Sequence, residues 1–190
     1  PLPVFATMTF GEDGRSFMGT TPAIAATTLS ALGASAVGIN CSLGPAETAP
    51  LVTQMAPYAR CPLMVQPNAG LPRMDADGST VYDVTPGKFA QAMRGILAAG
   101  ARVIGGCCGT TPEHIAALRR LIDEDGETRG GQAGYRPSFV VTSAQSLVEL
   151  APGSDDIAVI GERINPTGKP RLKEALVDGS YDLIVSEAVG

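Results

Sequence analysis

Short apolar runs alternate with longer helical patterns over residues 1–125, and this alternation most constrains how the chain can fold. The predicted strands are residues 3–10, 35–41, 62–67 and 102–107, and the predicted helices are 21–34, 47–59, 85–101 and 111–125. Short apolar strands joined through helices indicate a parallel sheet that helices cover. The sequence therefore predicts an α/β fold, either a doubly wound open sheet or an eight-stranded barrel.

The ends of the predicted helices carry residues that favour helix starts and stops. In the first helix Thr21 can cap the amino end, Pro22 suits the first helical position, and Gly33 suits the stop. The third and fourth helices repeat the Thr-Pro start. These signals support the boundaries that the apolar pattern predicts.

Residues able to bind a ligand collect where the predicted strands end. Both architectures bind ligands at the carboxyl ends of their strands. The residues at those ends include Thr9, Asn40, Cys41, Asn68, Cys107 and Cys108. Cys61 begins its strand instead, which places it at the opposite edge. We therefore expect three of the four cysteines at one edge of the sheet.

Three thiolates at one edge suit a zinc ion. Zinc binds four ligands, so three cysteines leave one position open, as in catalytic sites. Neighbouring strand residues point to opposite faces. Cys107 and Cys108 can therefore share an ion only if the chain leaves strand geometry, which the glycines around them permit. The alternatives are a pair of small buried residues, a vicinal disulfide at a tight turn, or a phosphate-binding turn before a helix.

Two polar residues near the cysteines allow more than one interpretation. His114 is the only histidine, and its place in the first turn of a helix favours a surface or helix-start role over a metal ligand. The amide oxygen of Asn68 can reach a metal or orient a substrate, but asparagine is also a common loop residue. Both interpretations of Asn68 stay open.

Composition and charge exclude several classes of function. The net charge of −5 opposes binding to nucleic acid or an anionic membrane. No apolar stretch is long enough to span a membrane, and no signal peptide is visible. Four cysteines in 190 residues are too few for a secreted disulfide scaffold. We expect a cytoplasmic protein that uses its thiols for metal binding or chemistry.

The composition changes after the fourth predicted helix. Residues 126–137 are rich in glycine and polar residues and are expected to form a linker. Residues 138–150 suggest a strand or a packed extension, 156–168 a strand and loop, and 169–179 a short helix, and another helical pattern occupies 180–190. Since that pattern stops at the chain end and no methionine starts the sequence, we expect a piece of a longer polypeptide.

Several stretches resemble a known family when they are taken in order. "INCSLGP", "NAGLP", "YDVTPGKFA" and "GARVIGGCCGTTPEHI" resemble the homocysteine-binding domain of the cobalamin-dependent methionine synthases, a branch of the homocysteine S-methyltransferase family. "VIGERINPTGKPRLKEAL" resembles the start of the pterin-binding barrel that follows that domain. The order of these two segments is more specific than either segment by itself.

The resemblance implies an architecture for the whole chain. Residues 1–125 would be the second half of a TIM-type (βα)8 barrel that binds homocysteine. Residues 126–155 would be an interdomain linker and extension, and residues 156–190 the start of the methyltetrahydrofolate-binding barrel. Four βα units leave two open sheet edges, so we expect self-association or contact with the remaining domains of a full-length enzyme.

The resemblance also implies a site and a reaction. Zinc would be held by Cys41, Cys107 and Cys108, while Glu162 and Asn165 match positions that line the folate pocket. Zinc would convert homocysteine to a thiolate, which accepts a methyl group from methylcobalamin to give methionine. Methylcobalamin would be bound by a domain outside this chain, with methyltetrahydrofolate as the methyl source. Thr9 and Asn68 are the candidate substrate-binding residues.

Other functions remain open, and we expect this chain by itself to be inactive. A related methyltransferase could use another thiol or a folate-independent methyl donor. A non-catalytic fragment could serve as a zinc-binding or assembly module. A redox protein could use a disulfide between Cys107 and Cys108.

Overall fold

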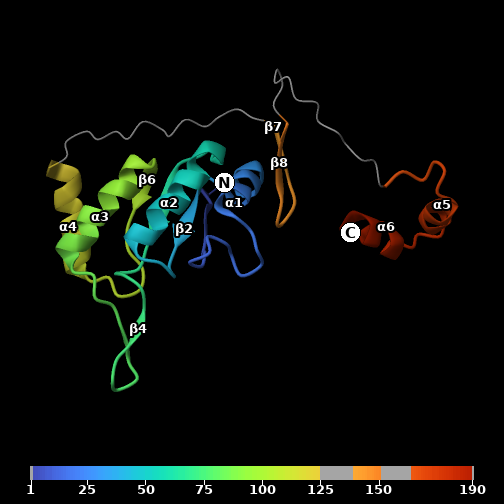
Figure 1. Cartoon of the computed structure of the whole chain (residues 1–190). Coiled ribbons are helices and arrows are strands. Elements are labelled where there is room, and N and C mark those ends of the chain that lie inside the picture. The colour runs from blue at the N-terminus through green and yellow to red at the C-terminus, as the bar shows by residue number, and fades with distance from the viewer. Residues whose placement is uncertain (1, 125–138, 151–163, 190) are drawn as a thin grey trace. The chain divides into compact units, whose positions relative to one another are not determined.

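The computed structural model describes residues 2–124, 139–150 and 164–189. The chain divides into two compact units, Pro1–Pro152 and Gly153–Gly190 (Figure 1). The first unit contains a four-stranded sheet with its covering helices, and the described part of the second, residues 164–189, contains two helices.

The central sheet of the first unit is parallel, as the sequence predicts. Its strands are β1 (Phe5–Met8), β2 (Ala36–Asn40), β3 (Leu63–Gln66) and β6 (Ala101–Ile104), which lie side by side in the order β1-β2-β3-β6. A doubly wound sheet reverses its strand order at a switch point. Among the described residues the order follows the chain without reversal, so the α/β fold is confirmed and this sheet departs from the doubly wound pattern.

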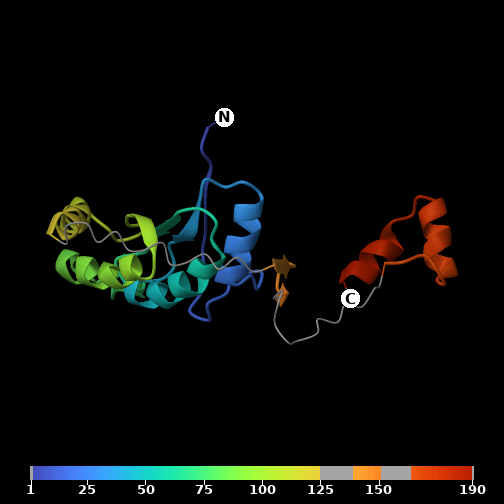
Figure 2. The same cartoon turned by 90° about the horizontal axis from the view of Figure 1, so that it is seen from above.

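Four helices follow the four strands in turn. They are α1 (Pro22–Ala31), α2 (Pro45–Met55), α3 (Pro86–Ala98) and α4 (Pro112–Glu124), and each packs against the next (Figure 2). Every one begins with proline, which suits the first helical turn because that turn needs no N–H partner. A 3₁₀ turn, η1 (Ala56–Tyr58), extends α2, so the helix predicted at 47–59 starts earlier and ends in a different geometry.

The core lies between the sheet and these helices. Alternate strand residues such as Val37, Ile39 and Val65 are almost wholly buried, as are Phe89 and Met93 of α3. On the other side of the sheet, a Cβ atom added at Gly38 would lie 1.7 Å from the carbonyl oxygen of Met64. Glycine therefore allows β2 and β3 to approach closely where they lead to the carboxyl edge.

Two hairpins extend this unit. β4 (Arg73–Met74) and β5 (Thr80–Val81) pair within the segment between β3 and α3, where the sequence pattern predicts neither a strand nor a helix. Their hairpin projects from the unit (Figure 1). Strands of two residues are too short to show an alternating pattern. β7 (Phe139–Thr142) and β8 (Leu147–Leu150) form the second hairpin, which satisfies the expectation of a strand or packed extension at 138–150.

The second hairpin packs against α1. The hydroxyl of Thr20 donates to the carbonyl of Ala144 at 2.9 Å, and the hydroxyls of Thr28 and Thr142 lie 3.3 Å apart. The predicted boundaries of the linker at 126–155 stay a prediction, since residues 125–138 and 151–163 lie outside the described ranges.

The second unit contains α5 (Pro170–Val177) and α6 (Asp182–Val189), which contact each other. Leu172 is buried, and Lys169 Nζ lies 3.2 Å from Glu187 Oε2. The predicted helix at 169–179 and the helical pattern after residue 180 are confirmed. Most of the strand predicted at 156–168 falls outside the described residues. None of the helices in the described ranges has the length and hydropathy needed to cross a bilayer.

Candidate metal centre

Cys41 stands where β2 turns away from the sheet. Cys41 and Ser42 have φ angles of 61° and 62°, a left-handed conformation that ends the strand. The N–H of Cys41 donates to the carbonyl of Gln66 at 3.0 Å, and the N–H of Leu43 donates to the carbonyl of Cys41 at 2.8 Å. These bonds hold the first thiol at the carboxyl edge, beside β3.

Cys107 and Cys108 follow β6 in a turn that has left strand geometry. The N–H of Cys107 donates to the carbonyl of Pro67 at 2.9 Å. Both the N–H and the hydroxyl of Thr110 donate to the carbonyl of Cys107, at 3.2 and 2.6 Å. The turn brings the two adjacent side chains to one side, as a shared ion would require.

The three sulfur atoms have the spacing of ligands around one ion. Cys108 Sγ lies 3.7 Å from Cys41 Sγ and 3.9 Å from Cys107 Sγ, and all three atoms lie within 4.8 Å of one another. Around zinc with bonds of ~2.3 Å, tetrahedral ligands are separated by about 3.8 Å. A disulfide needs only ~2.05 Å, and all three cysteines are free. The donor set therefore fits a thiophilic tetrahedral ion.

Asn68 joins the two cysteine loops. Its side chain is 2% exposed, and its Oδ1 accepts a hydrogen bond from the N–H of Cys108 at 3.1 Å. Its own N–H donates to the carbonyl of Leu43 at 2.9 Å, and the N–H of Ala69 donates to the carbonyl of Cys108 at 2.9 Å. Asn68 therefore supports both loops from the end of β3.

The thiols differ in how readily they ionise. Burial, followed by hydrogen bonding to Cys41, raises the pKa of the Cys107 thiol to about 11. Burial also opposes ionisation of Cys41, but hydrogen bonds from the Ser42 backbone and from the neighbouring thiols hold the pKa of Cys41 below its ordinary value. Cys41 thus ionises before Cys107, and a bound cation would favour the thiolate form of each ligand.

Tyr82 is a neighbour of the thiols that the sequence did not reveal. Desolvation, and then its interaction with Cys108, raises the pKa of the Tyr82 phenol. Gly109 has a φ of 75°, and a Cβ atom there would lie 2.3 Å from Cγ of the Tyr82 ring. The ring therefore lies directly against the Gly109 backbone. Nothing in the spacing between Tyr82 and the cysteines signals this contact.

His114 does not join the thiol cluster. It stands in the first turn of α4, which confirms the helix-start role, while its 5% exposure shows that the alternative of a surface residue was wrong. Its Nδ1 accepts from the N–H of Thr111 at 3.1 Å, its Nε2 lies 2.9 Å from the carbonyl oxygen of Val84, and its ring meets Phe89 edge to face. Three packed partners explain why a histidine in this first turn is buried.

The remaining predicted site residues lie elsewhere. Thr9 follows β1 and is exposed, and in the described part of the chain no hydrogen bond joins its side chain to the cysteines or Asn68. Asn165, in the second unit, accepts a hydrogen bond from the N–H of Thr167 at 2.9 Å. Glu162 lies outside the described residues.

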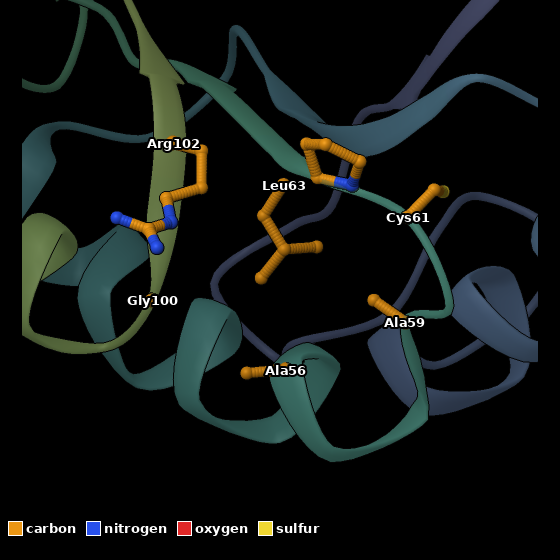
Figure 3. Close-up of a pocket in the computed structure, with 7 residues that line it drawn as sticks. Ala56, Ala59, Cys61, Leu63, Gly100 and Arg102 are labelled. Carbon is orange, nitrogen blue, oxygen red and sulfur yellow. The ribbon is translucent and has the colours of Figure 1, made fainter. Parts of the chain in front are cut away.

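Cys61 occupies the opposite edge, as predicted. It precedes β3 and its Sγ lies 3.7 Å from Ser30 Oγ. It lines a cavity of about 250 Å³, where Arg102 stands on the other side (Figure 3). Among the described residues, the group of possible metal ligands contains the other three cysteines and excludes Cys61.

Known proteins match the sequence of this chain. The family model described as homocysteine S-methyltransferase matches residues 1–122. The methionine synthases of Mycobacterium tuberculosis and Mycobacterium leprae are 35% and 34% identical over 181 and 185 residues, 95% of this chain in each case. The chain spans 15% of the length of either relative.

A solved structure also shares sequence with part of the chain. It is the crystal structure of the homocysteine methyltransferase MmuM from Escherichia coli in its oxidized form. The match is 29% identical in sequence and covers 50% of this chain and 29% of that chain. Its TM-score of 0.38 is too low to support a statement about the fold. The match over residues 1–122 includes every residue of the thiol cluster, and the chain belongs to the homocysteine S-methyltransferase family.

Proposed function

We propose that this chain supplies the zinc site of a methyltransferase of the methionine synthase type, which activates homocysteine as a methyl acceptor. The observation that carries the proposal is the spacing of three thiols from two loops at the carboxyl edge of a parallel sheet. Sulfur separations of 3.7 and 3.9 Å match the edge of a tetrahedral site.

The residues of the chain have distinct tasks in this proposal. Cys41, Cys107 and Cys108 hold the ion, and Asn68 fixes the two loops relative to each other through its bonds to Cys108 and Leu43. A bound Zn²⁺ would lower the pKa of the homocysteine thiol, so that it reacts as a thiolate at neutral pH. Three protein ligands leave room for that sulfur in the fourth position.

Thr9 and Asn68 are the candidates for binding the rest of homocysteine. Both follow strands of the sheet at its carboxyl edge. The Oδ1 of Asn68 already accepts from Cys108, which leaves its amide N–H groups as donors toward a substrate. Thr9 is exposed and offers a hydroxyl.

The whole enzyme would need parts that this chain does not contain. We propose that residues 1–125 form the second half of a TIM-type barrel, that 126–155 connect it to the next domain, and that 156–190 begin a methyltetrahydrofolate-binding barrel with Glu162 and Asn165. Methylcobalamin would be bound by another domain. The match to the two methionine synthases over 95% of the chain supports this arrangement over a folate-independent methyltransferase.

Zinc titration of the full chain tests the proposal. We expect one zinc per chain in the parent protein, and loss of tight binding in the Cys107→Ser, Cys108→Ser double variant. Cys61→Ser is the matched control, because it removes a thiol from the opposite edge. Equal zinc stoichiometry in the parent and the double variant would refute the proposed site.

Homocysteine addition tests the open position. X-ray absorption of the zinc-loaded chain should show three sulfur neighbours before homocysteine is added and four afterwards. A spectrum that homocysteine leaves unchanged would contradict the role of this ion in substrate activation.

A further inference from the structure

The segment between β3 and α3 is anchored at the thiol cluster at both of its ends. Near its start, the N–H of Ala69 donates to the carbonyl of Cys108 at 2.9 Å. Near its end, the N–H of Val84 donates to the carbonyl of Ala69 at 3.0 Å. Arg73 and Asp83 also pair across it at 2.8 Å. The residues next to Val84 therefore have a defined position relative to Cys108.

Tyr82 uses this position to contact the cysteine turn. Its ring lies against the backbone of Gly109, where any side chain would collide with it. Gly109 directly follows Cys108, so the ring borders the turn that carries the Cys108 thiol, and the raised pKa of the Tyr82 phenol agrees with this placement. A phenol can donate a hydrogen bond to sulfur, and a thiolate can only accept one. Once Cys108 is a metal ligand, a hydrogen bond between the two groups can therefore run only from the phenol to the sulfur.

His114 holds the same segment from the side of α4. Nδ1 accepts from the N–H of Thr111, so the neutral ring carries its proton on Nε2 and donates it to the carbonyl of Val84 at 2.9 Å. Val84 is two residues from Tyr82. Helix α4, which follows the cysteine turn, is thus hydrogen-bonded to the segment that carries the phenol.

We propose that Tyr82 is a positioning residue of the metal centre, whose phenol donates a hydrogen bond to the Cys108 thiolate, and that His114 acts through it. This inference rests on the proposed zinc site. Three thiolates carry one more negative charge than Zn²⁺ neutralises, and a homocysteine thiolate adds another. A hydrogen bond to Cys108 disperses part of that excess, as partners of metal ligands commonly do.

Cobalt(II) in place of zinc gives a direct readout, because the thiolate-to-cobalt absorption depends on the charge on sulfur. Tyr82→Phe keeps the ring against Gly109 and removes only the hydroxyl. We expect this band to move to longer wavelength, since a thiolate without its donor is easier to oxidise. We also expect zinc affinity to fall about tenfold, the lower end of the effect of such partners.

Tyr58→Phe is the matched control. It removes the hydroxyl that donates to Glu149, away from the thiol cluster, and should leave the cobalt band and the zinc affinity of the full chain unchanged. A change in Tyr58→Phe equal to that in Tyr82→Phe would show a general effect of losing a tyrosine hydroxyl, and would overturn the inference.

His114→Gln tests the indirect part of the inference. If His114 acts by holding Tyr82, the variant should shift the band in the same direction, and adding it to Tyr82→Phe should produce less than the sum of the two effects. Additive shifts would refute the role of His114. Circular dichroism of each variant verifies the fold, and Tyr82→Phe by itself tests the role of the phenol if His114→Gln unfolds.

The two proposals can fail separately. A parent chain that binds neither zinc nor cobalt refutes the metal centre and the inference with it. A chain that binds one ion, but whose cobalt band and zinc affinity are the same in the parent and in Tyr82→Phe, refutes only the role of Tyr82.

Discussion

Cysteines stand at both edges of the same sheet, but their surroundings differ. At the carboxyl edge, Cys41, Cys107 and Cys108 converge, and the backbone of each of their loops is hydrogen-bonded to the segment after β3. At the amino edge, Cys61 meets a serine hydroxyl and a small cavity. The direction of the strands makes this difference, because loops that follow parallel strands gather at one edge. Four predictions, from the largest expected effect to the smallest, test it.

Cys41→Ser should have the largest effect. This variant leaves two adjacent thiols and removes the ligand that comes from another strand, so zinc affinity should fall by more than about a hundredfold, beyond the usual cost of losing an outer partner. Competition with a chromophoric chelator measures the affinity. Retention of parent affinity would mean that Cys107 and Cys108 bind the ion without β2.

Gly38→Ala tests whether the close approach of β2 and β3 supports the carboxyl edge. An added Cβ would meet the Met64 carbonyl oxygen at 1.7 Å, so the backbone must shift at a cost of about 3 kcal/mol or more in the free energy of unfolding. Urea unfolding measures this. Gly87→Ala is the control, since nothing lies near its added Cβ in α3, and it should leave stability equal or raise it by up to about 1 kcal/mol.

Asn68→Ala should loosen both cysteine loops without removing a ligand. The buried N–H of Cys108 loses its acceptor, so stability should fall by about 1–3 kcal/mol. Zinc affinity should fall about 10- to 100-fold. Thermal unfolding and the chelator competition check the two parts. A stable variant with parent affinity would show that the backbone bonds around Ala69 hold the loops without this side chain.

Cys61→Ser should have the smallest effect. Cys61 is half-buried and stands outside the thiol cluster, so zinc stoichiometry should not change and stability should alter by less than about 1 kcal/mol. Zinc titration beside urea unfolding measures both. A loss of zinc binding in this variant would contradict the claim that only the cysteines of the carboxyl edge bind the ion.

Much of the fold could be predicted because it follows from local patterns. The four strands and four helices appear near their predicted places, and Thr21 caps α1 by accepting from the N–H of Ile24. The β4–β5 hairpin escaped prediction, since its two-residue strands carry no periodicity. The burial of His114 also escaped it, because its partners Val84 and Phe89 lie far from it in the sequence.

By itself, the sequence determined that the strands are parallel and that three cysteines follow them while one precedes them. Periodicity and chain direction suffice for that. Only the tertiary structure decided that sulfur atoms 67 residues apart lie 3.7 Å from each other, that Asn68 links their loops, and that Tyr82 rests on Gly109. These contacts depend on left-handed turns, on a close approach of two strands and on one anchored segment. Such features arise when distant parts of the chain pack together, and spacing along the sequence does not record them.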